Sequence, residues 1–560
     1  MYLHKFQIIN FRSIENLTIN FNKETNILIG SNNIGKSSII DALRLCFSYG
    51  QYNQRREIYI SKNDFFVSKS SGAISKKIEF HMEFEIDDDD IEAGIFYDLL
   101  VVNTDGTKCL KLHLKYFKEG SDNNFKIRFK AWGGENEGQP ISTEILEHLY
   151  FIYLGALRDA ENDLRPVKGN KLSSLYQQIS TPTEPTDLVG ILRDSLKDDK
   201  WVDFISRGKN EINEHLDKIT FKGDTKEIEI TPLPFQFERI TESMEVRIPF
   251  TKDVNFDLSQ NGLGYNNLIY TSTILGDLNK RKEYYKALLI EEPEAHLHPQ
   301  LQNILFEYLS KNDNFQRFIT SHSPTITAKT NLDSLIVLHK NKDDKICSLN
   351  LKDSGLTPDN KKYLAKFLDV TKSQLFFAKG VIFVEGISEA LLLPRFAELL
   401  GYDLEKEGIE IVNVNGVAFE SFANLYNNPD DAKNINVKAS ILTDADGKKS
   451  GEKCARAIKA EQFQNKSLLV KLSDITFEYE LFKIKKNQKI LIEIAKSLRP
   501  DLIKEFVEID FESDEKRDIR FKEIISNTKS EFAHKLVFEI NEDNFTVPNY
   551  IKEAIEWVVK

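Results

Sequence analysis

The sequence has few cysteines and no long apolar run. The four cysteines among its 560 residues, Cys46, Cys109, Cys347 and Cys454, lie far apart and include no C-x-x-C pair. This spacing argues against a zinc ribbon or a disulfide framework and is typical of a reducing cytoplasm. No segment approaches the roughly 20 apolar residues of a membrane span, and residues 1–6 lack the apolar region of a signal peptide. We therefore expect a cytoplasmic protein without a membrane partner.

The sequence also lacks an excess of positive charge. Its formal net charge is −12, so nucleic-acid binding would require a local basic groove rather than a basic surface overall. The apolar content of 41% and charged content of 29% are typical of a globular protein. The length allows about three or four domains.

A phosphate-binding loop is the most specific motif. Residues 30–37 have the pattern G-x-x-x-x-G-K-S, between an apolar strand at 26–29 and a helix at 38–45. Glycines and the helix N-terminus would direct N–H groups at phosphate, Lys36 would reach the β- and γ-phosphates, and the Ser37 hydroxyl would bind Mg²⁺. The remaining expected ATP contacts in this motif are Asn32, Asn33, Gly35 and Ser38.

Strand patterns surround this loop. Residues 3–9 and 17–21 are expected to form strands before it. Strict apolar–polar alternation then predicts an antiparallel meander with one buried face around residues 78–86, 110–116 and 125–129. We interpret the acidic run at 87–90 as a solvated turn rather than a metal site.

Paired carboxylates follow a later apolar strand. Residues 287–290 lead into Glu291 and Glu292, which are costly at a buried strand end unless they have a function. One would serve Mg²⁺ and the other would polarise the attacking water. A second strand, 317–321, ends at His322, which is placed to contact the γ-phosphate.

Two neighbouring features are open to more than one interpretation. His296 and His298 could form a metal site with Glu294, but their spacing suits zinc poorly and favours a loop. Residues 165–220 are expected to form a helical insertion with an apolar stripe. Its members are Leu188, Ile191, Leu192 and Leu196. That stripe is either a partner face or, more typically, packing inside the insertion.

Together these motifs resemble the ABC-type ATPases, and Arg12 in its Asn-Phe-Arg-Ser setting resembles their SMC/RecF-like branch, where this arginine lies near the nucleotide. The resemblance implies that Glu291 is the Mg²⁺ ligand and Glu292 the catalytic glutamate. It also implies ATP sandwiched between two copies, with Ser259 and Gly262 of the signature segment 258–264 reaching the other copy's γ-phosphate. This signature, L-S-x-x-G, departs from the usual pattern. The Q-loop position stays open among Gln51, Gln54 and the Asp64–Phe65 segment.

The second half carries different chemistry. Glu385 follows an apolar strand at 380–384, Glu389 lies one helical turn later, and Asp444 and Asp446 follow a strand at 439–443. Ligands bind at the carboxyl ends of strands in open α/β sheets. Aspartates two apart in an extended strand end would point to the same side. We therefore expect these acids to converge on Mg²⁺ or Mn²⁺.

This half resembles a Toprim domain of the OLD (overcoming lysogenisation defect) family of nucleases, which includes Gabija-type and retron-associated defence proteins. The resemblance rests on Val384-Glu385-Gly386, Asp444-x-Asp446, Glu478 and a late Lys529. It implies DNA cleavage with two metal ions. The implied metal ligands are Glu385, Glu389, Asp444, Asp446 and Glu478. Lys529 would stabilise charge on the scissile phosphate.

Five basic residues follow the acidic pair directly. They are Lys448, Lys449, Lys453, Arg456 and Lys459. They could form a groove that binds the DNA backbone, or equally a solvated helix face.

The expected fold is α/β, with an ABC-type (SMC/RecF-like) ATPase, an antiparallel β subdomain, a helical insertion and a Toprim domain. The expected boundaries are 1–165 and 236–345 for the ATPase, 166–235 for the insertion, 346–374 for a connector and 375–560 for the Toprim domain. The insertion is a candidate dimerisation element.

We therefore predict an ATP-hydrolysing, metal-dependent DNA endonuclease, acting as a homodimer or higher homo-oligomer in defence against phage. It would use one Mg²⁺ or Mn²⁺ at the ATPase site and two at the Toprim site. A helicase-like protein or a retron reverse transcriptase with its DNA are further partners that the resemblance allows. The alternative is an ATP-driven DNA-binding or sensor protein whose Toprim domain binds metal without cutting.

Overall fold

The structure is a computed structural model, and it describes all residues except 50–57, 87–89, 122–123, 157–159, 220–227, 231–234, 251–254, 296, 312–313, 342 and 417–418. The Q-loop candidates Gln51 and Gln54, most of the acidic run at 87–90, and His296 lie outside the described residues. The chain divides into two compact units. The first comprises residues 1–153, 287–294 and 299–560, and the second comprises 154–286 and 295–298.

An antiparallel sheet forms the β subdomain of the first unit. Its strands, in spatial order, are β2 (Ile14–Asn20), β1 (Tyr2–Phe11), β4 (Lys77–Glu85), β6 (Lys108–Ser121) and β5 (Leu100–Val102), with β7 (Asn124–Gly133) also paired to β6. Alternate side chains such as Phe80, Leu112 and Leu114 are fully buried on one face. The predicted meander is therefore confirmed, and β1 and β2 begin earlier than expected.

A second sheet carries the nucleotide motifs. Its order is β14 (Ile346–Asn350), β13 (Leu335–Lys340), β3 (Thr25–Ile29), β12 (Gln316–Thr320), β11 (Tyr285–Glu291) and β8 (Leu149–Leu154). β3, β12, β11 and β13 run parallel to one another. Parallel strands are joined by crossover connections and are buried on both faces, which explains why these strands are apolar. The expected connector at 346–374 thus begins with a strand of this sheet, β14.

Short helices complete the ATPase part of the first unit. They are α1 (Lys36–Phe47), α2 (Asp90–Ile95), α3 (Thr143–Glu147), α10 (Pro299–Ser310), α11 (Pro324–Lys329) and α12 (Pro358–Phe367), with 3₁₀ turns at Lys62–Asp64, Tyr97–Leu99, Leu332–Ser334, Leu351–Asp353 and Lys372–Phe376. α1 begins directly after the glycine loop, with Gly35 as its N-cap in the left-handed region at φ 96°. No helix within the described ranges has the length and apolar character needed to cross a bilayer.

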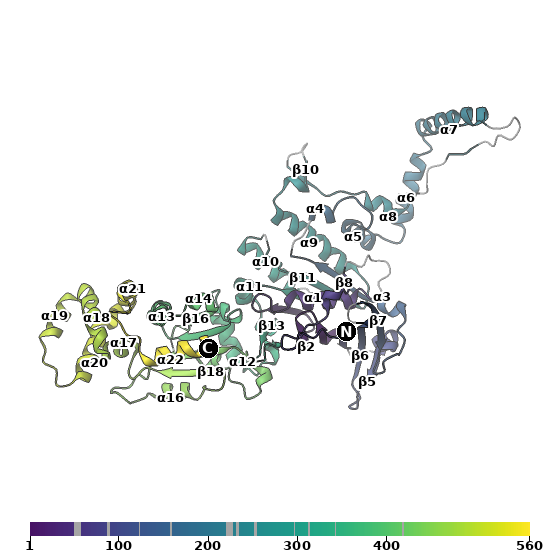
Figure 1. The fold of residues 1–560 in the computed structure, drawn as a ribbon. Helices are drawn as coiled ribbons and strands as arrows, with labels where there is room; N and C mark the ends of the chain where they lie inside the picture. Colours follow the sequence, from purple (N-terminus) through teal and green to yellow (C-terminus); the bar gives the residue numbers. More distant parts are fainter. Residues whose placement is uncertain are drawn as a thin grey trace. The chain divides into compact units, whose positions relative to one another are not determined.

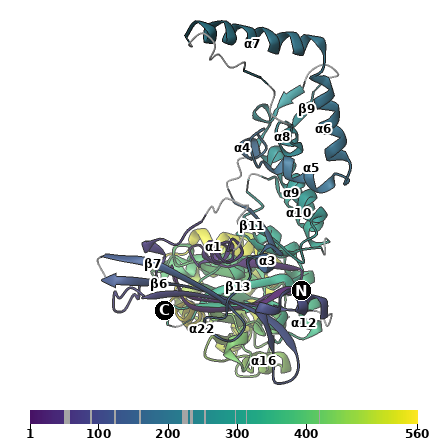
Figure 2. The same cartoon turned by 90° about the vertical axis from the view of Figure 1, so that its right-hand side faces the viewer.

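The second unit is mainly helical (Figure 2). It contains α4 (Ala160–Asp163), α5 (Lys171–Ile179), α6 (Glu184–Ser195), α7 (Asp199–Ile219), α8 (Phe237–Glu242), α9 (Leu263–Lys280), a 3₁₀ turn at Leu258–Gln260, and the small β9 (Arg247–Pro249) and β10 (Asn255–Asp257) pair. The expected helical insertion is present, and α9 follows the signature segment. Leu188 and Ile191 of the apolar stripe are 43% and 65% exposed. These two side chains therefore do not pack inside the insertion.

The Toprim sheet is parallel and belongs to the first unit (Figure 1). Its order is β16 (Ile409–Asn413), β15 (Gly380–Val384), β17 (Lys438–Thr443) and β18 (Leu468–Leu472). Its helices are α13 (Ile387–Leu399), α14 (Leu404–Glu407), α15 (Phe419–Ala423), α16 (Ala455–Glu461), α17 (Phe477–Lys483), α18 (Lys485–Leu498), α19 (Pro500–Glu508), α20 (Asp514–Ile525), α21 (Lys529–Glu539) and α22 (Asn549–Val559), with 3₁₀ turns at Asp431–Lys433 and Ser526–Thr528. The predicted α/β fold class is confirmed.

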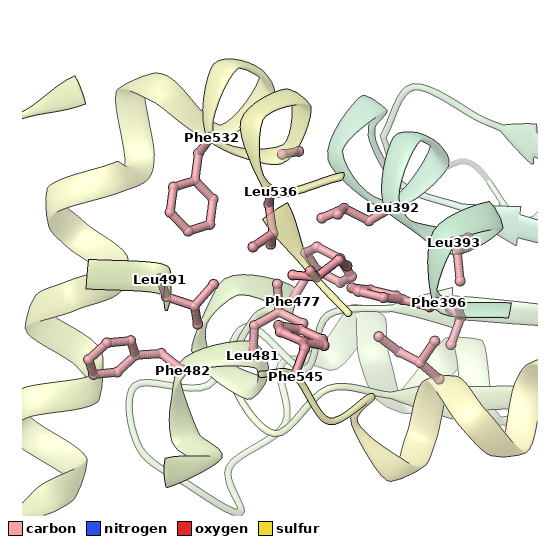
Figure 3. Packing of buried hydrophobic residues seen from close by; sticks show 14 of the residues in the cluster. Leu392, Leu393, Phe396, Phe477, Leu481, Phe482, Leu491, Phe532, Leu536 and Phe545 are labelled. Atoms are coloured by element: carbon pink, nitrogen blue, oxygen red, sulfur yellow. The ribbon is translucent and has the colours of Figure 1, made fainter. Parts of the chain in front are cut away.

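One apolar cluster holds the C-terminal helices against this sheet. Phe396 of α13 stacks on Phe545, with ring centroids 5.4 Å apart, and Phe482 of α17 stacks on Phe521 at 3.8 Å. Figure 3 shows Phe532 and the other labelled side chains of several helices pointing toward this common interior. α21 packs against α13, and Phe477 of α17 lies 6.3 Å from Phe396 of α13 between ring centroids. Glu478 at the start of α17 and Lys529 at the start of α21 pair with each other, and both charges act on Glu389 in the first turn of α13.

Candidate active sites

The loop after β3 holds a buried lysine whose partners are main-chain oxygens. Lys36 is 4% exposed, and its Nζ donates hydrogen bonds to the carbonyl oxygens of Gly30 at 2.6 Å and Ser31 at 2.9 Å. Burial lowers the pKa of Lys36 to about 8, and the nearby Glu292 and Glu294 carboxylates only partly oppose this effect. A buried cation of this kind gains strongly from a bound phosphate anion. The loop therefore fits a nucleotide phosphate.

Glycine is required at the start of this loop. Gly30 has φ 144°, and a Cβ there would lie 2.5 Å from the carbonyl oxygen of Leu338 on β13. Asn33 also adopts a left-handed conformation, at φ 59°. Asn32, Asn33 and Gly35 thus lie in the β3–α1 turn, and Lys36, Ser37 and Ser38 form the first residues of α1.

The acids after β11 face this loop. Tyr153 donates a hydrogen bond from its hydroxyl to Glu291 Oε2 at 2.9 Å, while Glu291 Oε1 is buried with no hydrogen-bond partner in the described part of the chain. Burial raises the pKa of Glu291, although the hydrogen bonds from Tyr153 and Ser37 oppose it. A desolvated carboxylate beside the Ser37 hydroxyl fits a Mg²⁺ ion, which prefers oxygen ligands.

Glu292 and His322 lie next to each other at the ends of β11 and β12. His322 Nε2 is 3.6 Å from Glu292 Oε1, and Glu292 adopts the left-handed region at φ 43°. The pKa of His322 is lowered by burial and by the charge of Lys36, against the opposing charge of Glu292. A carboxylate and a largely neutral imidazole at this edge can orient an attacking water and contact a γ-phosphate.

Arg12 lies in a network of charges beside the loop. Its Nε donates to Asp64 Oδ1 at 2.8 Å and its NH1 to Asp41 Oδ2 at 2.6 Å. Arg44 donates to the other Asp41 oxygen at 2.9 Å and lies 3.6 Å from the centroid of the Tyr153 ring. These contacts connect Arg12 to Tyr153 and so to Glu291. Asp41, Arg44 and Tyr153 were not predicted as site residues, because their local sequence shows only ordinary helix and strand patterns.

The expected trans-acting signature belongs to the second unit. Ser259 lies in the 3₁₀ turn at Leu258–Gln260 and Gly262 is the N-cap of α9. Both residues are exposed, and a reciprocal capping box between Asp257 and Gln260 organises the turn. Their role toward ATP stays a prediction.

The Toprim acids come together because β15 and β17 are parallel neighbours. Gly380 pairs with Lys438 and Phe383 with Ile441, so the residues that follow the two strands meet at one edge. Glu385 Oε1 accepts hydrogen bonds from the Asp444 backbone N–H at 3.1 Å and from the Thr443 hydroxyl. Ser473 donates to Asp444 Oδ1 at 2.9 Å.

Two helix N-termini add further charges. Glu389 lies in the first turn of α13 and Glu478 in the first turn of α17. Lys529 Nζ is 2.8 Å from Glu478 Oε1, whereas Glu478 Oε2 is buried without a hydrogen-bond partner among the described residues. Burial lowers the pKa of Lys529, but the charges of Glu478, Asp444 and Glu389 outweigh that effect and raise it.

Burial, reinforced by neighbouring negative charges, raises the pKa values of Asp444 and Glu389. Burial raises the pKa of Asp444 well above its usual range, and the charges of Glu385, Glu478 and Glu389 add to this effect. Burial likewise raises the pKa of Glu389 to about 7, reinforced by Glu478 and Glu385. Clustered carboxylates that resist ionisation are the donor set expected for hard divalent cations.

Asp446 is held differently from Asp444. The expectation of an extended strand end is wrong here, because β17 ends at Thr443 and Asp446 has φ 49°. Arg456 NH2 lies 2.5 Å from Asp446 Oδ2 and 3.7 Å from Glu385 Oε1. Arg456 therefore contacts both Asp446 and Glu385 and holds Asp446 beside the other acids. As the side chains stand, no three His, Cys, Asp or Glu groups within the described ranges are arranged to hold a metal ion.

The basic residues after Asp446 are mostly engaged. Lys453 pairs with Glu461 at 2.7 Å, and Lys459 pairs with Glu420 at 2.6 Å. Lys448 and Lys449 lie in an exposed turn, and none of the ion pairs in the described part of the chain involves them. Of the five basic residues, only Lys448 and Lys449 are exposed and outside the ion pairs of the described residues, as a groove that binds the DNA backbone requires.

Comparisons with known proteins match both halves of the chain. The AAA ATPase domain family matches residues 1–138 and 144–327, and the overcoming lysogenization defect protein-like TOPRIM domain family matches residues 376–446. An endonuclease GajA of Bacillus cereus (strain HuB5-5) is 25% identical over 55% of this chain and 54% of its own length. The match thus spans about half of that relative.

Two further proteins are similar. An OLD nuclease of Thermus scotoductus is 23% identical over 74% of this chain and 78% of that protein. The solved C-terminal region of the Burkholderia pseudomallei OLD protein is 23% identical, with a TM-score of 0.27, and covers 33% of this chain and 98% of that region. The AAA ATPase domain family covers more than half of the chain and is followed by a match to the OLD-like TOPRIM domain, so the chain belongs to the AAA ATPase domain family and carries an OLD-like Toprim segment.

Proposed function

We propose that this protein is an ATP-hydrolysing, metal-dependent DNA endonuclease. The observation that carries the proposal is the convergence of Glu385, Glu389, Asp444 and Glu478 beside Lys529, in a chain that also contains a phosphate loop with a catalytic-type acid pair. Relatives named endonuclease and nuclease support the same activity.

Each residue of the Toprim site has a task in phosphodiester cleavage. Glu385, Asp444 and Asp446 would hold divalent cations together with Glu389 and Glu478. Mg²⁺ or Mn²⁺ bound there, two ions in our proposal, would supply Lewis-acid activation of water and of the scissile phosphate. Lys529 lies beside these acids and would stabilise negative charge developing on the phosphate.

The ATPase site would hydrolyse the γ-phosphate. Lys36 and the loop N–H groups would bind the β- and γ-phosphates, and Ser37 with Glu291 would hold one Mg²⁺. Glu292 would accept a proton from the attacking water, and His322 would contact the γ-phosphate. Arg12 would act near the nucleotide through its contact with Asp41 on α1.

The assembly and setting complete the proposal. Ser259, in the 3₁₀ turn before α9, and Gly262, the N-cap of α9, are exposed, which supports a role for them at the nucleotide of a second copy in a homodimer or higher homo-oligomer. A cytoplasmic location, inferred from the wide spacing of the four cysteines in the sequence, is part of the proposal. DNA is the proposed substrate, and defence against phage is the proposed role.

Cleavage of supercoiled plasmid tests the activity. Wild type, Glu385→Ala and Lys36→Ala would be incubated with Mg²⁺ or Mn²⁺, with and without ATP. We expect wild type to nick or linearise the plasmid and Glu385→Ala to show at least a hundredfold loss. Glu405→Ala, an exposed acid on α14, is the matched control and should cut like wild type.

The Lys36→Ala variant shows whether ATP controls cutting. A change in its cleavage relative to wild type would mean that nucleotide occupancy controls the nuclease. Equal cutting by wild type and Glu385→Ala would contradict the assignment of the Toprim site. ATP hydrolysis and DNA binding without any cutting would favour the DNA-binding or sensor function instead.

A further inference from the structure

Glu294 joins the two turns that carry Glu292 and His322. β11 and β12 are parallel neighbours, with Glu291 opposite Thr320, so the segments after both strands meet at one edge. Glu294 Oε1 accepts one hydrogen bond from the Ser321 hydroxyl at 2.8 Å and a second from the His322 backbone N–H at 2.9 Å. One carboxylate oxygen thus holds the segment on which His322 lies.

Weaker contacts reinforce the same junction. The Glu292 N–H donates to the Thr320 carbonyl oxygen at 3.0 Å, and the Ser323 N–H donates to the Ser321 hydroxyl at 3.0 Å. Hydrogen bonds to a carboxylate are roughly twice as strong as those between neutral groups. The Glu294 side chain is therefore the main side-chain tie between the two turns.

The free-energy cost of burying the Glu294 carboxylate indicates that this residue has a function. Glu294 Oε2 is buried without a hydrogen-bond partner in the described ranges. Burial raises the pKa of Glu294, although the hydrogen bonds from His322 and Ser321 oppose it. The negative charge of Glu294 also raises the pKa of the buried Lys36, against the larger effect of burial. A partly unsatisfied buried carboxylate destabilises a fold, so its presence between two catalytic turns calls for a compensating role.

We propose that Glu294 is a positioning residue for ATP hydrolysis, which holds His322 and Glu292 in one arrangement toward the γ-phosphate. The proposal rests on the ATPase activity proposed above. Glu294 acts through His322 and need not touch the nucleotide. Nucleotide binding by the phosphate loop should then depend little on Glu294, whereas the chemical step should depend on it strongly.

Steady-state ATPase kinetics and binding of a fluorescent ATP analogue test this role. Glu294→Ala removes both acceptor contacts, and we expect kcat to fall at least tenfold while the Kd for the analogue changes less than threefold. Glu294→Gln keeps an oxygen that accepts both bonds and should retain at least a third of the wild-type kcat. Ser321→Ala removes one of the two bonds and should show an intermediate kcat.

Control variants distinguish the positioning role of Glu294 from a general loss of folding. Glu307→Ala, which removes an exposed glutamate of α10 that pairs with Lys311, should behave as wild type. A kcat of Glu294→Ala within twofold of wild type, or a Glu294→Gln as impaired as Glu294→Ala, would overturn the positioning role. If Glu294→Ala fails to fold, Ser321→Ala and Glu294→Gln still decide the question. Absence of hydrolysis by wild type would instead refute the proposed ATPase activity.

Discussion

At the residue scale, each site buries charged groups that a bound ligand would pair with. Lys36 is a buried cation whose hydrogen bonds go to carbonyl oxygens, which suits an incoming phosphate. The Toprim site instead gathers carboxylates, and burial together with neighbouring negative charge raises the pKa values of Asp444 and Glu389, which suits incoming cations. Lys36 and the Toprim carboxylates are therefore the groups that the proposed phosphate and metal ligands would pair with.

Lys529 should matter for stability as well as cleavage. Lys529→Met leaves Glu478, whose side chain is 4% exposed, without its ion-pair partner. Removing one member of a buried pair costs about 3–5 kcal/mol, and the partial exposure of Lys529 reduces this to about 2 kcal/mol. We expect that loss in the free energy of unfolding, measured with urea in the absence of metal.

A lysine on the same helix is the control for this substitution. Lys535→Met removes an exposed side chain that donates to Ser497, and it should change the free energy of unfolding by less than about 0.5 kcal/mol. Equal effects of Lys529→Met and Lys535→Met would show that the Lys529–Glu478 pair does not stabilise the fold.

At the element scale, neighbouring strands decide which side chains meet. Parallel β15 and β17 place Glu385 against Asp444, and parallel β11 and β12 place Glu292 against His322. In the antiparallel sheet, register places His81 of β4 opposite His113 of β6, with their Nδ1 atoms 2.7 Å apart. Burial, followed by the charge of His113, lowers the pKa of His81 to about 4.

Acid should weaken this strand pair. Because the folded-state pKa of His81 lies below its unfolded value, its contribution to stability is present above about pH 6.5 and is lost as pH falls toward 4. Between pH 7.5 and 5 we expect this group to account for a loss on the order of 1–2 kcal/mol. Urea unfolding at both pH values should show a smaller loss for His81→Gln than for wild type.

The exposed His534→Gln on α21 serves as the comparison. It should lose as much stability on acidification as wild type does. If His81→Gln and wild type respond equally to pH, the β4–β6 histidine pair is not a source of acid sensitivity.

At the scale of the whole molecule, metal binding should be linked to folding. A ligand that binds only the folded chain raises Tm, and carboxylate ligands must lose their protons first. The pKa of Glu389 is about 7, and that of Asp444 is raised well above its usual range. Millimolar MnCl₂ should therefore raise Tm by a few degrees at pH 8 and by clearly less at pH 6.

Asp444→Asn should remove most of this stabilisation at both pH values, measured by calorimetry. The exposed Glu405→Ala should keep it. A rise in Tm that is the same at pH 6 and pH 8 in wild type would contradict metal binding by these two acids.

The sequence alone determined the features that depend on local spacing. The β3–loop–α1 unit is predictable because glycine positions, the strand and the helix lie within about twenty consecutive residues. Period-two alternation identified β4, β6 and β7, since alternate side chains of a strand face the same side. Glu385 and Asp444 were predictable as strand-end acids because each directly follows an apolar strand.

Only the tertiary structure decided which distant side chains meet. Tyr153 and Glu291 are separated by 138 residues, and their contact depends on the order of strands in the sheet. The Lys529–Glu478 pair depends on how α17 and α21 pack on α13, and the left-handed turn at Asp446 overrides the strand geometry expected there. Such contacts arise from burial of apolar surface across the whole chain, which residue spacing does not encode.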